Sequence, residues 1–464
     1  MPQVPQTLFN TLPLPPATLE NLTRLGYHEM TPIQAASLPS ALLGKDLIAQ
    51  AKTGSGKTAA FALALLANLN ARRFAVQSLV LCPTRELADQ VTTEIRRLAR
   101  AEDNIKVVTL TGGVPLRGQS ASLEHGAHIV VGTPGRVLDH LDRANLNLEA
   151  LNTLVLDEAD RMLDMGFADD IAKLVKQCPA QRQTMLFSAT YPEGIAKLAA
   201  QFLRNPVTVK VDAEHAGGQI EQRWYEVREP DRLPTVARLL DHFRPASALA
   251  FCNTRARCRE LVELLQAQGY SALALHGDLE QRDRDQVLVR FANGSCTVLV
   301  ATDVASRGLD VAGLAAVINV EVTPDPEVHV HRIGRTGRAG QTGLALNLAS
   351  LDEMGAVGRI DQMQGKASAW NELAELTPAA GGRLLPAMAT IHIQAGRKEK
   401  IRPGDVLGAL TADFGYTREQ IGKIDINEFA TYVAVAREIG REAVVKLNEG
   451  RIKGRSVKAR LLAN

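Results

Sequence analysis

Residues 46–58 of the chain read DLIAQAKTGSGKT. Their apolar start is typical of a buried strand, and the alanine-rich run that begins near Ala59 predicts a helix. The glycine-rich loop between them ends in Gly56-Lys57-Thr58, as phosphate-binding loops do. In such a loop the backbone N–H groups surround phosphates, Lys57 contacts the β and γ oxygens, and Thr58 is a Mg²⁺ ligand. We therefore expect a nucleotide site with Mg²⁺ as cofactor.

Two acidic residues complete this expected site. The apolar strand at 154–156 runs directly into Asp157 and Glu158. An α/β sheet binds its ligand at the carboxyl ends of its strands, so both carboxylates are expected near the phosphates. Asp157 would hold the metal ion through its water shell, and Glu158 would orient or deprotonate the attacking water.

The chain carries the same strand-and-helix pattern twice. Short runs rich in Val, Leu and Ile alternate with helical stretches, which predicts parallel sheets of βαβ units. The first series contains DLIAQ, SLVLCP, KVVTLT, HIVVGT, TLVLDE, TMLFSA and VTVKV. After a glycine-rich break at 216–218, the second contains ALAFCN, SALALHG, TVLVAT, AVINVE and GLALNL. The second series lacks a phosphate loop, so we expect the two copies to have different roles.

The last part of the chain predicts a smaller domain of another kind. A length of 464 residues suggests three compact units. Around 364–386 the periodicity fades into Ala, Gly, Pro and Ser, which predicts a flexible linker. Beyond it, the order βαββαβ, with helices at 403–410 and 442–447, predicts an RRM-like domain.

Charge and composition narrow the class of protein. The net charge is +2, but residues 388–464 carry about +5 and the preceding residues about −3, which favours a polyanion-binding appendage. The sequence has no apolar run of roughly 18 residues and no signal-peptide pattern, so we expect no membrane span and a cytoplasmic location. The five cysteines are scattered without a CxxC pair, so we expect neither a metal cluster nor a disulfide framework.

The motifs of both copies resemble those of the DEAD-box RNA helicases, over roughly residues 9–365. The motifs that carry the resemblance are Gln34 with Phe9, the phosphate loop, Pro83-Thr84-Arg85, Gly112-Gly113, Thr133-Pro134-Gly135-Arg136, Asp157-Glu158-Ala159-Asp160, Ser188-Ala189-Thr190 and 331–338. The family has an α/β fold. The resemblance implies two tandem RecA-like parallel-sheet domains plus a small C-terminal RRM-like α+β domain, with bounds at 1–213, 214–365, a linker at 366–387, and 388–464.

The resemblance also implies roles for individual residues. ATP would be the nucleotide, bound by Phe9, Gln34, Thr53, Gly54, Ser55, Gly56, Lys57, Thr58 and Asp310, with Mg²⁺ on Thr58 and Asp157. Catalysis would rest on Lys57, Glu158 and two arginine fingers, Arg335 and Arg338, which reach the phosphates only when the domains close. RNA contacts would come from Pro83, Thr84, Arg85, Gly113, Thr133, Arg136, Arg255, Gly277, Arg284 and Thr302.

The C-terminal domain resembles that of DbpA-like bacterial DEAD-box proteins, through 402–410, Ile421-Gly422-Lys423-Ile424, 432–435 and Ile452-Lys453-Gly454-Arg455. Such proteins use this domain to bind a hairpin of 23S ribosomal RNA, which implies a 23S rRNA hairpin and pre-50S particles as partners. Tyr432 is equally plausible as a base-stacking residue and as core filler. We favour recognition by the basic edge, whose members are Arg451, Lys453, Arg455, Lys458 and Arg460.

We therefore expect an ATP-dependent RNA helicase that separates short duplexes locally during large-subunit assembly. The alternative is an ATP-gated RNA clamp or ribonucleoprotein scaffold. A helicase and a clamp would use the same closed state, so the motifs do not distinguish them. A DNA helicase is disfavoured because the motif set resembles enzymes that contact RNA 2′-hydroxyls. His329 departs from the family pattern, where Tyr is usual, and we expect it to alter stacking within the second copy.

Overall fold

The computed structural model describes residues 7–51, 54–102, 104–191, 193–211, 220–306, 313–337, 342–381 and 384–462. The chain divides into two compact units, Met1–Glu214 and His215–Asn464. Within the described residues, no helix is long and apolar enough to cross a membrane. All five cysteines are free and buried.

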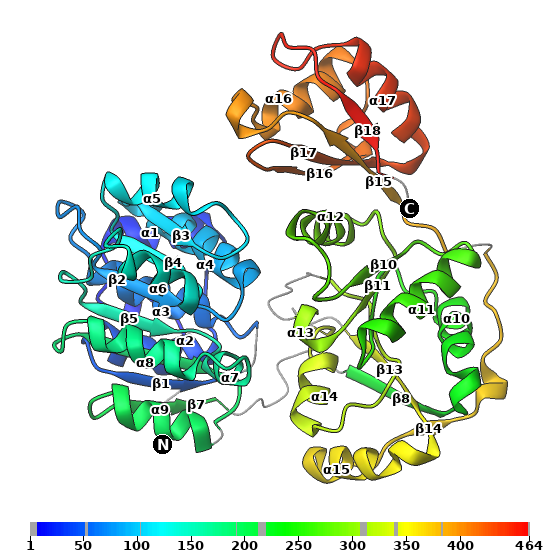
Figure 1. Ribbon diagram of the computed structural model, residues 1–464, viewed down its shortest axis with the longest axis horizontal. Helices are drawn as coiled ribbons and strands as arrows, with labels where there is room; N and C mark the ends of the chain where they lie inside the picture. Colours follow the sequence, from blue (N-terminus) through cyan, green and yellow to red (C-terminus); the bar gives the residue numbers. More distant parts are fainter. Residues whose placement is uncertain are drawn as a thin grey trace. The chain divides into compact units, whose positions relative to one another are not determined.

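The first unit is built on a seven-stranded parallel sheet with the order β3-β4-β2-β5-β6-β1-β7 (Figure 1). Every strand predicted for the first series is present. The strands are β1 Leu47–Gln50, β2 Ser78–Leu81, β3 Val107–Leu110, β4 Ile129–Gly132, β5 Thr153–Leu156, β6 Gln183–Ser188 and β7 Val207–Lys210. The helices are α1 Pro16–Arg24, α2 Pro32–Leu42, α3 Lys57–Ala67, α4 Arg85–Leu98, α5 Leu116–Glu124, α6 Pro134–Asp142, α7 Ala159–Asp164, α8 Ala168–Gln177 and α9 Glu193–Phe202.

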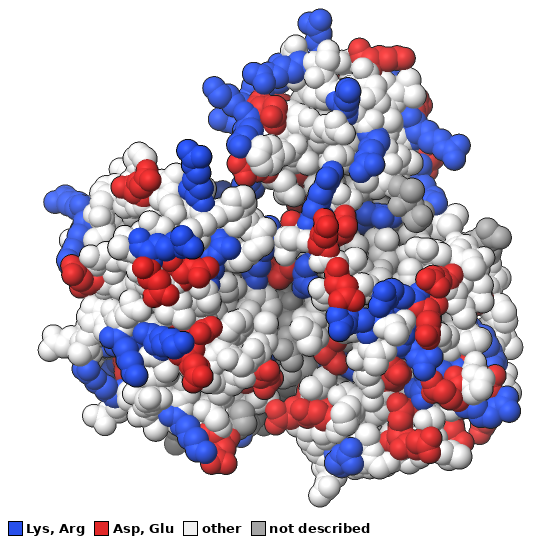
Figure 2. Space-filling model, viewed as in Figure 1, with Lys and Arg blue, Asp and Glu red and all other residues white. Residues whose placement is uncertain are grey.

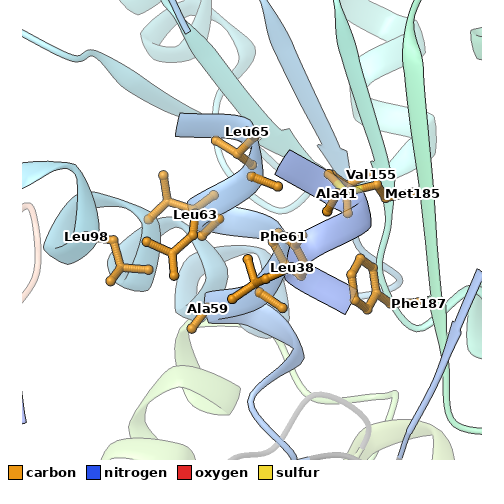
Figure 3. Close-up of a cluster of buried hydrophobic side chains, with 14 of the residues drawn as sticks. Leu38, Ala41, Ala59, Phe61, Leu63, Leu65, Leu98, Val155, Met185 and Phe187 are labelled. Carbon is orange, nitrogen blue, oxygen red and sulfur yellow. The ribbon is translucent and has the colours of Figure 1, made fainter. Parts of the chain in front are cut away.

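Helices cover both faces of this sheet, which is why its central strands are apolar throughout rather than alternating. One core contains side chains of α2, α3 and α4, and the other contains side chains of α6, α8 and α9. In the first, Phe61 of α3 packs edge-on against Phe187 of β6, with ring centroids 5.3 Å apart (Figure 3). This packing fixes α3, and therefore the loop that precedes it, against the sheet.

The second unit contains another seven-stranded parallel sheet, in the order β10-β11-β9-β12-β13-β8-β14. All strands predicted for the second series form, but β8 and β14 were not predicted. The strands are β8 Ile220–Glu226, β9 Ala248–Phe251, β10 Ala272–Leu275, β11 Val298–Ala301, β12 Ala316–Asn319, β13 Gly343–Ala349 and β14 Trp370–Asn371. The helices are α10 Arg232–Phe243, α11 Arg255–Ala267, α12 Gln281–Ala292, α13 Asp303–Ser306, α14 Pro326–Ile333 and α15 Met354–Gln364.

The prediction of a flexible linker at 364–386 is wrong for the residues that the structure describes there. Strand β14 adds to the sheet edge beside β8, and the chain then follows α10. The carbonyl of Leu373 accepts a 2.6 Å hydrogen bond from Arg238, and the N–H of Ala379 donates to Asp241 at 3.0 Å. Backbone groups that find partners in a sheet and on a helix hold the segment in one place.

The C-terminal domain has the predicted order βαββαβ. Its antiparallel sheet has the order β16-β17-β15-β18. The strands are β15 Met388–Ile393, β16 Ile421–Ile426, β17 Thr431–Ala436 and β18 Ala459–Leu461, and the helices are α16 Pro403–Gly408 and α17 Gly440–Glu449. A core cluster that includes Ile391, Val433, Val406 and Leu447 joins one face of the sheet to both helices.

Candidate functional site

The strand order of the first sheet brings three loops together. Strands β5, β6 and β1 are neighbours and run parallel, so their carboxyl ends lie at one edge. The phosphate loop follows β1, the acidic residues 157–160 follow β5, and 188–190 stand at the end of β6. The sheet therefore places the predicted phosphate and metal ligands side by side, as expected for an α/β ligand site.

The phosphate loop has the backbone that its glycines permit. Gly54 and Gly56 have φ angles of +81° and +93°, in the region that glycine adopts without strain. Lys57 is buried, and its ammonium donates a 2.8 Å hydrogen bond to the carbonyl of Ala51. Within the described residues, the buried hydroxyl of Ser55 has no hydrogen-bond partner. These features suit an anion in the loop; Thr53 lies outside the described residues.

Gln34 is joined directly to this loop. Its side-chain amide is buried and donates to the carbonyl of Gly56 at 3.0 Å, while its oxygen accepts from the N–H of Thr31 at 2.9 Å. A Cβ at position 56 would lie 2.6 Å from the Gln34 amide nitrogen, and the φ of +93° is one that L side chains rarely adopt, so this position favours glycine. Phe9 is buried, edge-on to Tyr27 at 6.3 Å. Phe9 belongs to the core cluster that also contains Ala51 and Ala59, the residues on either side of the loop.

The acidic pair is almost fully enclosed. Asp157 and Glu158 are 3% and 5% exposed. Burial raises the pKa of Asp157 to about 7, against the opposing effect of the Lys57 charge. Glu158 has a φ of +49°, which turns the chain sharply between β5 and α7, and its carboxylate lies 3.6 Å from the guanidinium of Arg161. A buried carboxylate with a raised pKa lacks sufficient positive charge around it, so a cation bound there would stabilise it.

Asp160, to which no role was given from the sequence, links the acidic loop to 188–190. One of its oxygens accepts hydrogen bonds from the N–H groups of Ala189 and Thr190 and from the Thr190 hydroxyl, at 3.1, 2.9 and 3.0 Å. Burial works to raise the pKa of Asp160, yet the Thr190 N–H and the Lys57 charge hold it below its usual value. These hydrogen bonds join the loop after β5 to residues 189–190 at the end of β6.

The residues of the first unit that were predicted to contact RNA lie after the other strands of the same sheet, β2, β3 and β4. Thr84 after β2 caps α4 by accepting from the N–H of Leu87 at 3.2 Å. Arg136 donates to the carbonyl of Val114 and to Gln119, both at 3.0 Å, which fixes the loop after β3. Pro83, Thr84, Arg85, Gly113, Thr133 and Arg136 thus follow the neighbouring strands β2, β3 and β4.

In the second unit, a buried arginine joins the ends of three adjacent strands. Arg332 is 1% exposed and donates to both oxygens of Asp303 at 2.7 Å, to Asn253 at 2.8 Å and to the Glu321 carbonyl at 2.8 Å. These partners follow β11, β9 and β12 respectively. Sequence reasoning placed Arg332 in a motif but gave it no role. It acts as a positioning residue for the loops around it.

The predicted RNA-facing residues of the second unit lie on those loops and the next one. Arg255 is exposed and paired with Asp278, and Arg284 donates to the Ala305 carbonyl at 2.6 Å. Gly277 follows β10 and Thr302 follows β11. Arg335, 7% exposed, follows α14 and its N–H donates to the Arg332 carbonyl at 3.1 Å. Arg338 and Asp310 lie outside the described residues.

Comparisons with known proteins bear on this arrangement. Residues 31–198 match the DEAD/DEAH box helicase family, residues 231–340 the helicase conserved C-terminal domain, and residues 390–461 the DbpA RNA binding domain. The chain is 52% identical to the ATP-dependent RNA helicase DbpA of Escherichia coli (strain K12) over 460 residues, 98% of this chain and 100% of that protein. The chain belongs to the DEAD-box family of ATP-dependent RNA helicases.

Other relatives agree with this assignment to the DEAD-box helicases. The DEAD-box ATP-dependent RNA helicase CshA of Geobacillus kaustophilus (strain HTA426) is 45% identical over 357 residues, 77% of this chain and 76% of that protein. Among solved structures, S. cerevisiae Dbp5 bound to RNA and ADP BeF3 is similar with a TM-score of 0.72 and 28% identity, over 79% of this chain and 96% of that one. Mss116p bound to ssRNA and AMP-PNP has a TM-score of 0.71 and 25% identity, over 80% of each chain.

In the C-terminal domain of this DEAD-box helicase, Tyr432 is buried. Tyr432 is 3% exposed, its ring centroid lies 5.1 Å from that of His392, and its hydroxyl is hydrogen-bonded with Gln286 of α12. Thr390 on the neighbouring strand is hydrogen-bonded with Asn293 at 2.9 Å. Tyr432 is thus covered by helix α12 rather than by the core of its own domain, which contains its strand neighbours Val433 and Val435.

The predicted basic edge of the DEAD-box helicase is exposed. One of its members, Lys453, contacts an acidic residue of α16, Asp405. Lys453 stands at a turn with a φ of +53°, and its ammonium donates to the Lys400 carbonyl at 3.0 Å and to Asp405 at 3.4 Å. Arg455 is exposed on the same turn. Figure 2 shows Lys and Arg side chains gathered on the C-terminal domain around α16 and the loop before β18. The fold therefore extends the basic edge onto the segment that precedes α16.

His329, the departure from the DEAD-box pattern, stacks on an aromatic ring. Its imidazole is 1% exposed and lies 5.4 Å from the Trp224 ring at 23°, with Nε2 3.3 Å from the Gln222 amide oxygen. Burial lowers the pKa of His329 to about 4, and the charge of Arg332 acts in the same direction. The imidazole is therefore neutral in the folded protein at neutral pH.

This imidazole should make the stability of the second unit depend on pH. In the unfolded chain His329 takes up a proton below pH about 6.5, while in the folded chain it does so only near pH 4. The stabilisation is present above pH about 6.5, and between pH 7 and pH 5 roughly 2 kcal/mol should be lost. Urea unfolding followed by tryptophan fluorescence should show this loss in the wild type and its absence in His329→Gln.

A substitution at a second histidine is the control for effects of acid pH on stability that do not involve His329. His242→Gln, a half-buried site on α10, should retain the pH dependence of the wild type. Equal pH dependence of His329→Gln and wild type would mean that other groups are responsible.

Proposed function

We propose that this helicase separates or remodels short RNA duplexes of 23S ribosomal RNA during assembly of the large ribosomal subunit, in the cytoplasm. The observation that carries the proposal is the exposed basic surface of a C-terminal domain that matches the DbpA RNA binding domain. A helicase body grips RNA mostly through its sugar–phosphate backbone and so has little means of choosing among RNAs. A separate basic domain can supply that choice.

In the proposed mechanism, the first unit binds ATP and activates water. Lys57 contacts the β and γ phosphates, the N–H groups of the phosphate loop surround them, and Phe9 and Gln34 contact the adenine. Glu158 orients or deprotonates the attacking water. The residues present fit Mg²⁺, because Asp157 is a buried carboxylate with a raised pKa and Thr58 follows Lys57. The ion would be held by Thr58 and Asp157, and when bound it neutralises phosphate charge.

The second unit makes hydrolysis conditional on RNA. Arg335, and Arg338 with it, would stabilise the charge of the transition state only when the two units close around the nucleotide. RNA that contacts both units favours closure, so ATP and RNA must strengthen each other's binding. On this proposal, helicase domain 1 spans 1–213, domain 2 spans 214–365, and the RNA-selecting domain spans 388–464. An ATP-gated clamp would use the same closed state with ATP and RNA. A comparison of strand-displacement rates with the lifetimes of the RNA complex distinguishes a helicase from a clamp.

Deleting residues 388–464 should abolish the preference for ribosomal RNA while leaving RNA-dependent ATPase activity on generic RNA. The C-terminal domain contributes no group to the proposed ATP site, so basal catalysis does not require it. ATPase activation by a 23S hairpin-containing fragment is compared with activation by an unrelated RNA of equal length, for full-length and truncated protein. A truncated protein that prefers the ribosomal fragment as strongly as the full chain would contradict the proposed targeting.

A further inference from the structure

One aromatic ring of the C-terminal domain lies open to solvent. Phe429, in the turn between β16 and β17, is 61% exposed, whereas Phe414, Tyr416 and Tyr432 are at least partly buried. An exposed phenylalanine forgoes the free energy of burial, so a ligand that covers it regains that free energy.

The turn that carries Phe429 is fixed by a second loop. The N–H groups of Arg397 and Lys398 donate to the carbonyls of Asn427 and Glu428, at 2.9 and 3.0 Å. A Cβ on Gly396 would lie 2.4 Å from the Asn427 carbonyl, so the close approach of the two loops depends on glycine. The ring is therefore presented by a rigid support, and binding to it costs little conformational entropy.

One cation lies against the ring, and others stand on the same segment of the chain. The ammonium of Lys398 lies over one face of the Phe429 ring, 4.1 Å from the ring centroid, and 3.3 Å from a carboxylate oxygen of Glu428. Arg397, Lys400 and Arg402 are exposed on the same segment. Since the Lys453 ammonium donates to the Lys400 carbonyl at 3.0 Å, this segment adjoins the basic edge described above. One aromatic platform at the margin of a basic surface is the combination that binds unpaired nucleotides.

We propose that Phe429 is a base-stacking subsite for an unpaired nucleotide of the bound RNA, with Lys398 beside the base and the phosphates running toward Lys400 and Lys453. This inference rests on the proposed function, because it assumes that the C-terminal domain selects RNA. A single ring among cations suits a nucleotide better than an apolar protein surface, for which a contiguous patch would be needed. Any base can stack on an aromatic ring, so the subsite would recognise that a nucleotide is unpaired and would not distinguish one base from another.

The test uses the full chain without nucleotide and two fluorescein-labelled RNAs with equal numbers of phosphates, a stem–loop and a blunt duplex. Phe429→Leu keeps apolar bulk but removes the aromatic face, and should weaken stem–loop binding by roughly 5- to 100-fold while duplex binding is unchanged. Phe429→Trp should bind the stem–loop at least as tightly as the wild type. Its added tryptophan emission should be quenched by the stem–loop and not by the duplex.

The matched control is Val445→Ala on α17, which also removes an exposed apolar side chain from this domain and should leave both affinities unchanged. Stem–loop binding by Phe429→Leu at the wild-type affinity overturns the subsite, as does an equal loss on the duplex. Lys453→Gln combined with Arg455→Gln separates the two proposals. If that variant loses stem–loop binding while the Phe429 variants do not, the subsite alone fails; if neither matters, RNA selection by this domain fails too.

Discussion

Replacing Glu158 with glutamine should slow ATP hydrolysis by about 10²- to 10⁴-fold while ATP and RNA still bind. The side chain sits where β5 ends, 5% exposed and 3.6 Å from Arg161. Glutamine has the same shape and can still lie beside Arg161, but it cannot take a proton from water. Steady-state ATPase assays with saturating RNA, together with fluorescent-nucleotide and RNA anisotropy titrations, measure the separate effects.

The control for this change is Glu149→Gln, which removes an exposed carboxylate from the same unit and should leave turnover unaltered. Turnover by Glu158→Gln within about threefold of the wild type would remove Glu158 from the mechanism. A large loss of nucleotide affinity would instead indicate that the carboxylate supports the site's structure.

Replacing Arg335 with alanine should lower RNA-stimulated ATPase activity by roughly 10³- to 10⁵-fold, the contribution known for arginine fingers. Nucleotide affinity without RNA should not change, because the residue belongs to the second unit and the phosphate loop to the first. Arg335→Lys should recover only part of the activity, since lysine keeps the charge but lacks the planar fork of donors. Pre-steady-state phosphate release separates this chemical step from binding.

Arg359→Ala is the matched control, because Arg359 is an exposed arginine on α15 of the same unit. A loss of less than about threefold in Arg335→Ala would argue that the second unit supplies no charge to the transition state. An equal loss of nucleotide affinity in the absence of RNA would also contradict the split site.

The fold was predictable wherever strands are buried on both faces. Leu154-Val155-Leu156 and its counterparts are apolar throughout, and each forms a central or near-central strand. Strand β8 was missed because Ile220–Glu226 neither alternates polar and apolar residues nor forms an apolar run, and only the tryptophan and tyrosine near its end are fully buried. Strand β14 was missed because two residues that pair with a sheet edge carry no periodicity at all.

The residues of the candidate site also divide into those that were predictable from the sequence and those that were not. The positions of Lys57, Asp157 and Glu158 were predictable because Asp157 and Glu158 follow directly on β5 and Lys57 ends the glycine-rich loop that follows β1. The roles of Asp160 and Arg332 were not, because they depend on which strands are neighbours in the sheet rather than on order along the chain. Phe429 was missed for a similar reason, since its exposure depends on how two loops meet.

The buried guanidinium of Arg332 has a consequence for folding. Its acceptors lie up to 79 positions away from Arg332 in the sequence, so the group is satisfied only when all three strand ends are in place. A partly folded state that buries Arg332 without one of these partners would cost about 3 to 5 kcal/mol. Intermediates with one loop detached are therefore sparsely populated. Hydrogen exchange should find that the amides of β9, β11 and β12 open together in a single cooperative event.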